Sequence, residues 1–195
     1  MSSAWECGLH GAVHPFHAPV QPSVEAVEQV VRGSGVPAWL PWPLPAGWVV
    51  TGIAYAGDER YGGRATVVAC SGPAPLGGGG DLLLIAEEPG VGLGARYAGL
   101  PGPDPGEVGE AAPAHAKLHA AGHPTAMWCV NGPPDRAVFV GEALARWLWA
   151  VLWPESAGCL LYEDIHLADL REAGQELSLL PFGALSPRLA VVPSD

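Results

Sequence analysis

The run Arg146-Trp147-Leu148-Trp149-Ala150-Val151-Leu152-Trp153 is the part of the sequence that constrains the architecture most strongly. Its seven consecutive apolar residues, three of them Trp, would form a large apolar patch on the surface of a soluble monomer. Periodicity does not separate a buried strand from a buried helix here, but bulky aromatic side chains that share one parity favour a strand. The residues of the other parity are apolar too. We therefore expect a central strand in a sheet covered on both faces, with Trp149 buried.

Further strands are predicted on both sides of this run, mostly without helices between them. Residues 48–56 and 64–71 favour a hairpin, because glycines in the connection allow positive φ angles. Shorter apolar segments predict strands at residues 81–87, 116–121, 126–130, 136–140 and 159–162. Because strands follow strands, we expect an α+β fold: a single domain with a mainly antiparallel sheet of at least five strands.

A few short helices and long Pro/Gly-rich loops complete the predicted fold. Ser23 as an N-cap, followed by valines at helical spacing and by Gly33 and Gly35, predicts a helix that begins after residue 23. A second helix is expected at residues 165–173. Four prolines exclude regular structure from residues 36–45, and residues 89–113 are predicted to be a loop. The predicted domain covers residues 23–190, between an N-terminal tail (1–22) and a short C-terminal one (191–195).

Charge and composition exclude several classes of partner. The formal net charge is −11, and the nine cations are eight Arg and one Lys, Lys117, without a cluster. Nucleic acids and anionic membranes bind clustered cations, so neither is an expected partner. No signal peptide pattern is visible, and no run approaches the ~18 apolar residues of a membrane span. The four cysteines lack a disulfide-framework spacing, so we expect a cytoplasmic protein, a monomer or a homodimer.

The N-terminal tail contains four residues of the types that bind zinc. Cys7, His10, His14 and His17 lie within eleven residues, and the Cys-x-x-His pair is a natural zinc knuckle. Their spacing matches no common zinc finger, so the alternative is a frayed tail without metal. Zinc is the one cofactor that the sequence suggests.

A glycine-rich loop and the predicted hairpin turn are candidate ligand sites. The loop at residues 90–96, with Gly92, Gly94 and Arg96, follows a predicted strand, and its N–H groups suit a phosphate. A flexible or tightly turned loop is the alternative, since glycines commonly mark turns. At the hairpin, Asp58, Arg60 and Arg64 suit a polar substrate, but an Asp in a turn commonly bonds its own backbone.

Two further groups of polar residues offer weaker signals. His115, His119 and His123 recur every fourth residue, a spacing that would align ligands on a helix, but Gly122 and Pro124 interrupt one. Exposed histidines without a ligand are the alternative. Carboxylates that suit acid–base chemistry or ordinary solvation occur near the expected C-terminal helix and at the end of the strand at 81–87: Glu163, Asp164, Asp169, Glu87 and Glu88.

Several motifs resemble those of a known family. They are WPLPAGW at residues 42–48, GDERYGGRAT at 57–66, ACSGP at 69–73, GVGLGARYAG at 90–99 and LPFGALSPR at 180–188. They resemble an uncharacterised family of actinobacterial proteins, a domain of unknown function. Some members carry an automatic phosphotransacetylase label, which no residue pattern of this chain supports. The resemblance implies a Cys-x-x-Cys pair upstream of Trp5-x-Cys7-x-x-His10. This chain lacks that pair, so either the gene start lies further upstream or the site is degenerate.

The function that we expect is that of a binding or interaction module, with an unknown protein or small molecule as its partner. Eight Trp suit an aromatic-lined groove, provided that the exposed ones form one patch. An enzyme acting on a small phosphorylated or acyl substrate is the alternative, and it requires Arg60, Arg64 and Arg96 to meet at one pocket. A third hypothesis is a regulator that docks its partner through the N-terminal zinc knuckle.

Overall fold

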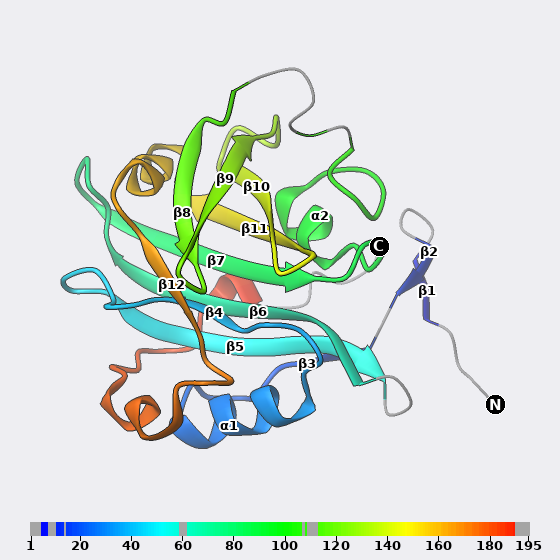
Figure 1. Cartoon of the computed structure of the whole chain (residues 1–195), viewed down its shortest axis with the longest axis vertical. Helices are drawn as coiled ribbons and strands as arrows, with labels where there is room; N and C mark the ends of the chain where they lie inside the picture. Colours follow the sequence, from blue (N-terminus) through cyan, green and yellow to red (C-terminus); the bar gives the residue numbers. More distant parts are fainter. Residues whose placement is uncertain are drawn as a thin grey trace.

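A ten-stranded sheet forms the body of the protein, in the order β3-β5-β6-β7-β11-β10-β9-β8-β12-β4 (Figure 1). The computed structural model describes residues 15–58, 62–106, 108 and 113–189, and the backbone alone of residues 5–7 and 11–13. The strands of this sheet are β3 (Phe16–His17), β4 (Trp39–Pro41), β5 (Val49–Asp58), β6 (Gly62–Pro73), β7 (Gly79–Glu87), β8 (Ala116–Ala120), β9 (His123–Cys129), β10 (Ala137–Ala143), β11 (Arg146–Trp153) and β12 (His166–Asp169). The remaining elements are α1 (Val24–Gly33), α2 (Leu93–Ala98), the 3-10 helices η1 (Glu155–Tyr162), η2 (Gly174–Leu179) and η3 (Pro187–Leu189), and a separate strand pair, β1 (Trp5–Cys7) with β2 (Gly11–Val13).

The Trp-rich run is a central strand, as predicted. β11 pairs along its length with β7 on one side and with β10 on the other. Trp149 and Val151 are fully buried on one face, and Leu148 and Leu152 are fully buried on the other. A strand whose side chains are apolar on both faces is stable here because both faces of the sheet are buried.

Two hydrophobic cores cover these two faces. The inner core contains Leu84, Leu148 and Trp39, and it lies inside the curl of the sheet. The outer core contains Ile85 and Trp149, and α2 packs over it against β7 and β11. The sheet curls far enough for its last strand, β4, to pack against β6 and β7 (Figure 1). α1 packs against β5 and η2.

Most of the predicted strands and the first helix are confirmed. β5 and β6 pair as an antiparallel hairpin from Val49↔Ser71 to Asp58↔Gly62. β7, β8, β9 and β10 lie where short strands were predicted. α1 begins directly after Ser23, whose side chain accepts a hydrogen bond from the N–H of Ala26. None of the helices in the described ranges is long and apolar enough to cross a membrane.

The expectation of an α+β fold is only partly right, because the protein is mainly sheet with few short helices. All but one of the strand pairs are antiparallel, and the exception is β8 with β12. The segment at residues 36–45, expected to be irregular, contains β4. This is possible because β4 is an edge strand that pairs only with β12, and an edge strand tolerates proline.

The two elements predicted after β11 are wrong. Residues 159–162 belong to the 3-10 helix η1 rather than to a strand, and from there Leu160 and Leu161 enter the inner core. Residues 165–173 contain the strand β12 rather than a helix, with Leu167 and Asp169 buried and His166 exposed. Short apolar segments do not separate these states by themselves. The expected loop at residues 89–113 contains α2, and residues 107 and 109–112 lie outside the described ranges.

Candidate metal centre

Two histidines from distant parts of the chain lie side by side on the parallel strand pair. His119 of β8 and His166 of β12 are direct partners in the register of these strands. Their imidazole rings stack with centroids 4.4 Å apart and an angle of 12° between the planes. Neighbouring strands lie about 4.8 Å apart, so partners in register naturally place their rings at this distance.

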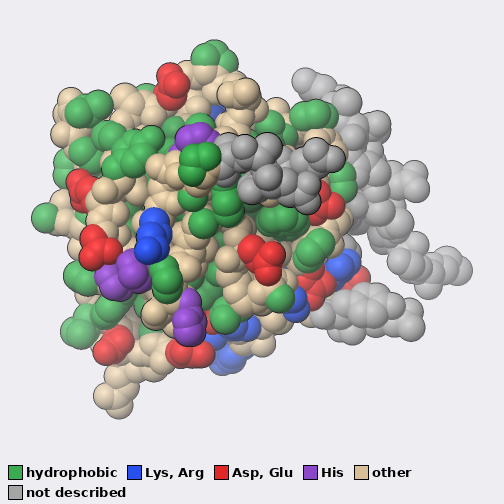
Figure 2. Space-filling view, turned by 45° about the horizontal axis from the view of Figure 1, so that its top comes forward, with side chains coloured by type: hydrophobic (Ala, Val, Ile, Leu, Met, Phe, Trp, Pro, Cys, Tyr) green, Lys and Arg blue, Asp and Glu red, His purple; other side chains and the backbone are tan. Residues whose placement is uncertain are grey.

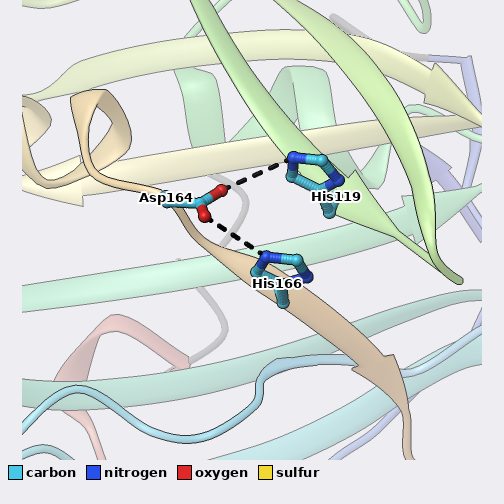
Figure 3. Close-up of side chains that lie close together, drawn as sticks. All are labelled: His119, Asp164 and His166. Carbon is cyan, nitrogen blue, oxygen red and sulfur yellow. Dashed lines mark ion pairs between the residues drawn. The ribbon is translucent and has the colours of Figure 1, made fainter.

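Asp164 brings a carboxylate to both rings. Its Oδ1 lies 3.5 Å from Nε2 of His119, and its Oδ2 lies 3.5 Å from Nε2 of His166. Figure 3 shows that both imidazoles point these nitrogens toward the one carboxyl group. His119 comes from β8, His166 is the first residue of β12, and Asp164 lies in the segment that leads into β12. The cluster His119–Asp164–His166 is the metal-site candidate that the described residues offer.

Buried neighbours orient the three side chains outward. On β8, Leu118 and Ala120 are buried, so His119 between them lies on the outer face. Ile165 and Leu167 are buried in the same way on either side of His166. The N–H of His119 donates to the carbonyl of Ile165 at 2.9 Å, which fixes the two strands beside each other.

The cluster is open to solvent. The side chains of His119, His166 and Asp164 are 30%, 54% and 79% exposed. In the space-filling view, histidine side chains lie at the surface next to acidic groups (Figure 2). A metal ion can therefore enter from solvent, and the positions not taken by protein ligands remain accessible to water or to an external ligand.

The donor atoms have the separations that a small metal ion needs. All three ligand atoms lie within 4.8 Å of one another. Two donors bound to one tetrahedral ion at about 2.0–2.2 Å are roughly 3.3 Å apart. The two 3.5 Å separations at Asp164 are already close to this value. Two imidazoles and one carboxylate form a donor set that suits zinc and related divalent transition metals.

A model of one protein family matches residues 1–189 of the 195-residue chain. The chain belongs to the family of unknown function DUF6758. This confirms the resemblance to an uncharacterised family that the sequence motifs indicated. No curated protein and no solved structure matches the chain. Membership of DUF6758 assigns no activity, so the case for a function depends on the geometry of this chain.

The sequence contained parts of this cluster but not the whole. His119 belonged to the row His115, His119 and His123, and Asp164 belonged to the acidic group near the expected C-terminal helix. The structure separates the row: Nδ1 of His115 accepts the N–H of Cys129, and His123 is exposed at the start of β9. His166 was missed because its segment was predicted to be helical. The alternation of buried Ile165 and Leu167 around it is the signal for a strand.

Of the four zinc ligands predicted in the N-terminal tail, the structure describes only the side chain of His17. The side chains of Cys7, His10 and His14 are outside the described residues. His17 is described, and its ring stacks on Tyr55 of β5 at 4.6 Å. Zinc binding by the tail therefore stays a prediction.

The glycine-rich loop holds a carboxylate of the protein itself where a phosphate was considered. Oε2 of Glu87 accepts the N–H groups of Leu93 at 2.7 Å and Gly94 at 3.1 Å, in the first turn of α2. Gly92 caps this turn with a left-handed conformation. A Cβ on Gly94 would lie 2.2 Å from the indole nitrogen of Trp149, so glycine permits close packing of α2 on β11.

Burial makes the carboxyl group of Glu87 a weaker acid than an ordinary glutamate. The residue is fully buried, and this burial raises the pKa of its carboxyl to about 7. The N–H groups of Gly94 and Leu93 act in the opposite direction, because they stabilise the charged form. The group is a proton-binding site inside the outer core.

The charged residues predicted at the hairpin and in the glycine-rich loop come from different elements. Nε of Arg64 lies 2.7 Å from Oε2 of Glu88, whose Oε1 lies 3.4 Å from Arg146. Asp58 ends β5, Arg96 lies in α2, and Arg60 is outside the described residues.

Every Trp that the structure describes is buried or half-buried: Trp39, Trp48, Trp149 and Trp153 are buried, and Trp42, Trp128 and Trp147 are half-buried.

Proposed function

We propose that this DUF6758 protein is a binding protein for a divalent transition-metal ion, with zinc as the first choice, and that the ion is held by His119, Asp164 and His166. The observation that carries the proposal is that two imidazole Nε2 atoms face one carboxylate from two strands in register. Three protein ligands leave at least one coordination position for water or for an external ligand, as in open zinc sites.

Direct hydrogen bonds explain this arrangement less well. A charge-assisted N–H···O bond to a carboxylate is about 2.7–2.9 Å long, and both contacts here measure 3.5 Å. A neutral imidazole that carries its proton on Nε2 can donate to a carboxylate, so it is the length of the two contacts that argues against direct hydrogen bonds. A metal ion between the three groups fits the longer separations, because it binds neutral imidazole nitrogens and a carboxylate and brings its own positive charge.

The general role expected from the sequence, a binding module, agrees with this proposal, whereas its expected aromatic groove finds less support. The groove requires exposed Trp residues that form one patch, and none of the described Trp residues is fully exposed. The enzyme alternative with Arg60, Arg64 and Arg96 stays a hypothesis. A metal with an open coordination position would give either role its chemistry, as a docking point or as a Lewis acid.

Zinc titration of chelator-treated protein tests the proposal. To keep the tail from contributing, the titration uses a chain with Cys7→Ala and His10→Ala. We expect one equivalent of zinc in isothermal titration calorimetry. His166→Ala and Asp164→Asn should each weaken binding at least about tenfold, since each removes or weakens a direct ligand and even the hydrogen-bond partners of ligands are worth roughly 10–100-fold in affinity. His123→Ala is the matched control, since this exposed histidine of β9 pairs with Ala120 and therefore lies on the strand face opposite to that of His119.

Cobalt substitution distinguishes the two candidate zinc sites in the unmodified chain. Co²⁺ at His119, Asp164 and His166 should give ligand-field bands without a thiolate-to-metal charge-transfer band, because this donor set contains no sulfur. A dominant thiolate band would place the metal at a cysteine instead, either Cys7 or another such as the exposed Cys129. The absence of stoichiometric binding in the double variant would refute the proposal.

A further inference from the structure

The candidate metal centre lies across the least supported strand junction of its neighbourhood. β8 and β12 pair through two register positions, His166↔His119 and Leu167↔Ala120. β8 pairs with β9 through five positions, and β12 pairs with β4 through three. The N–H of His119 donates to Ile165 at 2.9 Å, and the N–H of Ala121, which directly follows β8, donates to Leu167 at 3.4 Å. The second is a weak hydrogen bond.

This junction is also where the curl of the sheet is completed. β12 connects to β4 through the carbonyl of His166, which accepts the N–H of Trp42, and through the carboxylate of Asp169, which accepts the N–H of Ala38. β4 in turn packs against β6 and β7, and the hydroxyl of Thr66 in β6 donates to the carbonyl of Pro37. Opening the β8–β12 junction would therefore uncover the inner core at its edge.

The ligands are divided between the two sides of the junction. His119 comes from β8, whereas Asp164 and His166 belong to the segment of β12 (Figure 3). An ion with all three ligands can bind only while the two strands are paired. Any ligand that binds only one state stabilises that state by mass action.

Resting on the proposed function, we infer that the metal ion regulates the closure of the sheet: its binding to His119, Asp164 and His166 locks β12 and β4 onto β8. Without metal, the junction opens locally more often than the rest of the sheet. With metal, opening requires the loss of the His119 ligand first. The protein thereby converts metal availability into the accessibility of residues 163–170 and of the inner core beneath them.

Hydrogen exchange with mass spectrometry tests this inference on the full-length Cys7→Ala, His10→Ala chain. At a free zinc concentration about ten times the Kd, local opening should be about tenfold rarer. We expect this slowing for the amides of His119, Ala121 and Trp42, which donate across or beside the junction. The β5–β6 hairpin, which is far from the cluster in the strand order, should exchange at the same rate with and without zinc.

Two variants complete the test. His119→Gln removes the ligand on the β8 side, so zinc should no longer slow exchange at Ala121 and Trp42. His123→Gln should leave the zinc effect intact. Zinc that binds with the expected stoichiometry but slows exchange nowhere in β8, β4 or β12 would overturn the inference and leave the proposed function standing. No zinc binding by calorimetry would overturn the proposed function itself. The comparison of the Cys7→Ala, His10→Ala chain with and without zinc needs no substitution in the cluster, so a cluster variant that fails to fold does not affect it.

Discussion

The buried carboxyl of Glu87 should make the free energy of unfolding depend on pH. Burial raises its pKa to about 7 in the folded protein, whereas the ordinary value, which applies to the unfolded chain, is 4.5. Between these values the folded protein holds a proton that the unfolded chain has released. The contribution of Glu87 to the free energy of unfolding therefore falls as the pH rises from about 4.5 to about 7, and this contribution is constant above that range.

The size of the effect follows from the two pKa values. At about 1.4 kcal/mol for each pH unit, the difference between 4.5 and about 7 corresponds to roughly 3 kcal/mol. Glu87→Gln removes this cost above pH 7, because the amide is neutral at every pH and its oxygen still accepts the N–H groups of Leu93 and Gly94. The variant should therefore be more stable than the natural chain at about pH 8 and similar to it at about pH 5.

Urea unfolding followed by Trp fluorescence, from about pH 5 to about pH 8, measures the effect. Glu142→Gln is the control, since Glu142 is exposed on β10 and should leave the pH dependence unchanged. Glu25 and Asp135 have lowered pKa values, Glu25 through its backbone hydrogen bond and Asp135 through Arg136. Their contributions to stability are lost only in more acidic solution, outside this window. Equal slopes for the natural chain and Glu87→Gln would refute the reasoning.

Three further predictions concern packing and metal binding. Gly94→Ala should lower the free energy of unfolding by about 1–3 kcal/mol in urea unfolding, because the new Cβ meets the Trp149 indole at 2.2 Å. Gly79→Ala is the control, since its Cβ has open space around it, and equal losses for the two variants would contradict the packing argument. Trp149→Ala should lower the free energy of unfolding by about 3–5 kcal/mol, since the side chain is fully buried, and a loss under about 1 kcal/mol would show that the outer core is loosely packed. Zinc affinity should fall as the solution becomes more acidic, because protons compete with the metal for imidazole nitrogens, and a pH-independent affinity would exclude histidine ligands.

The core of the sheet could be predicted because single stretches of sequence determine it. Seven apolar residues of both parities in β11 demand cover on both faces, and the structure provides two cores. The β5–β6 hairpin and α1 also carry their signals locally, in the glycines of a turn and in the Ser23 cap. For such elements, local and tertiary preferences agree.

The elements after β11 could not be predicted, because tertiary contacts decide their conformation. β12 becomes a strand by pairing with β8 and β4, which lie far away in the sequence, and β4 tolerates its proline because it is an edge strand. The metal cluster depends on the same long-range register. Two histidines 47 positions apart in sequence become neighbours only when β8 and β12 pair, so no spacing rule reveals them.

Glu87 shows the same limit in its chemistry. The sequence shows an acidic pair at the end of a predicted strand. It does not show which of the two carboxyls is buried under α2 and which lies at the surface between Arg64 and Arg146. Burial sets the pKa, and burial is a property of the fold.

The position of a bound zinc ion would show whether His119, Asp164 and His166 hold a metal. Crystals grown with zinc, measured at the zinc absorption edge, would locate the ion by its anomalous signal. Our account predicts an anomalous peak about 2.0–2.2 Å from Nε2 of His119, from Nε2 of His166 and from a carboxylate oxygen of Asp164. Zinc bound only at other residues, with the two rings still stacked and no peak between them and Asp164, would contradict it.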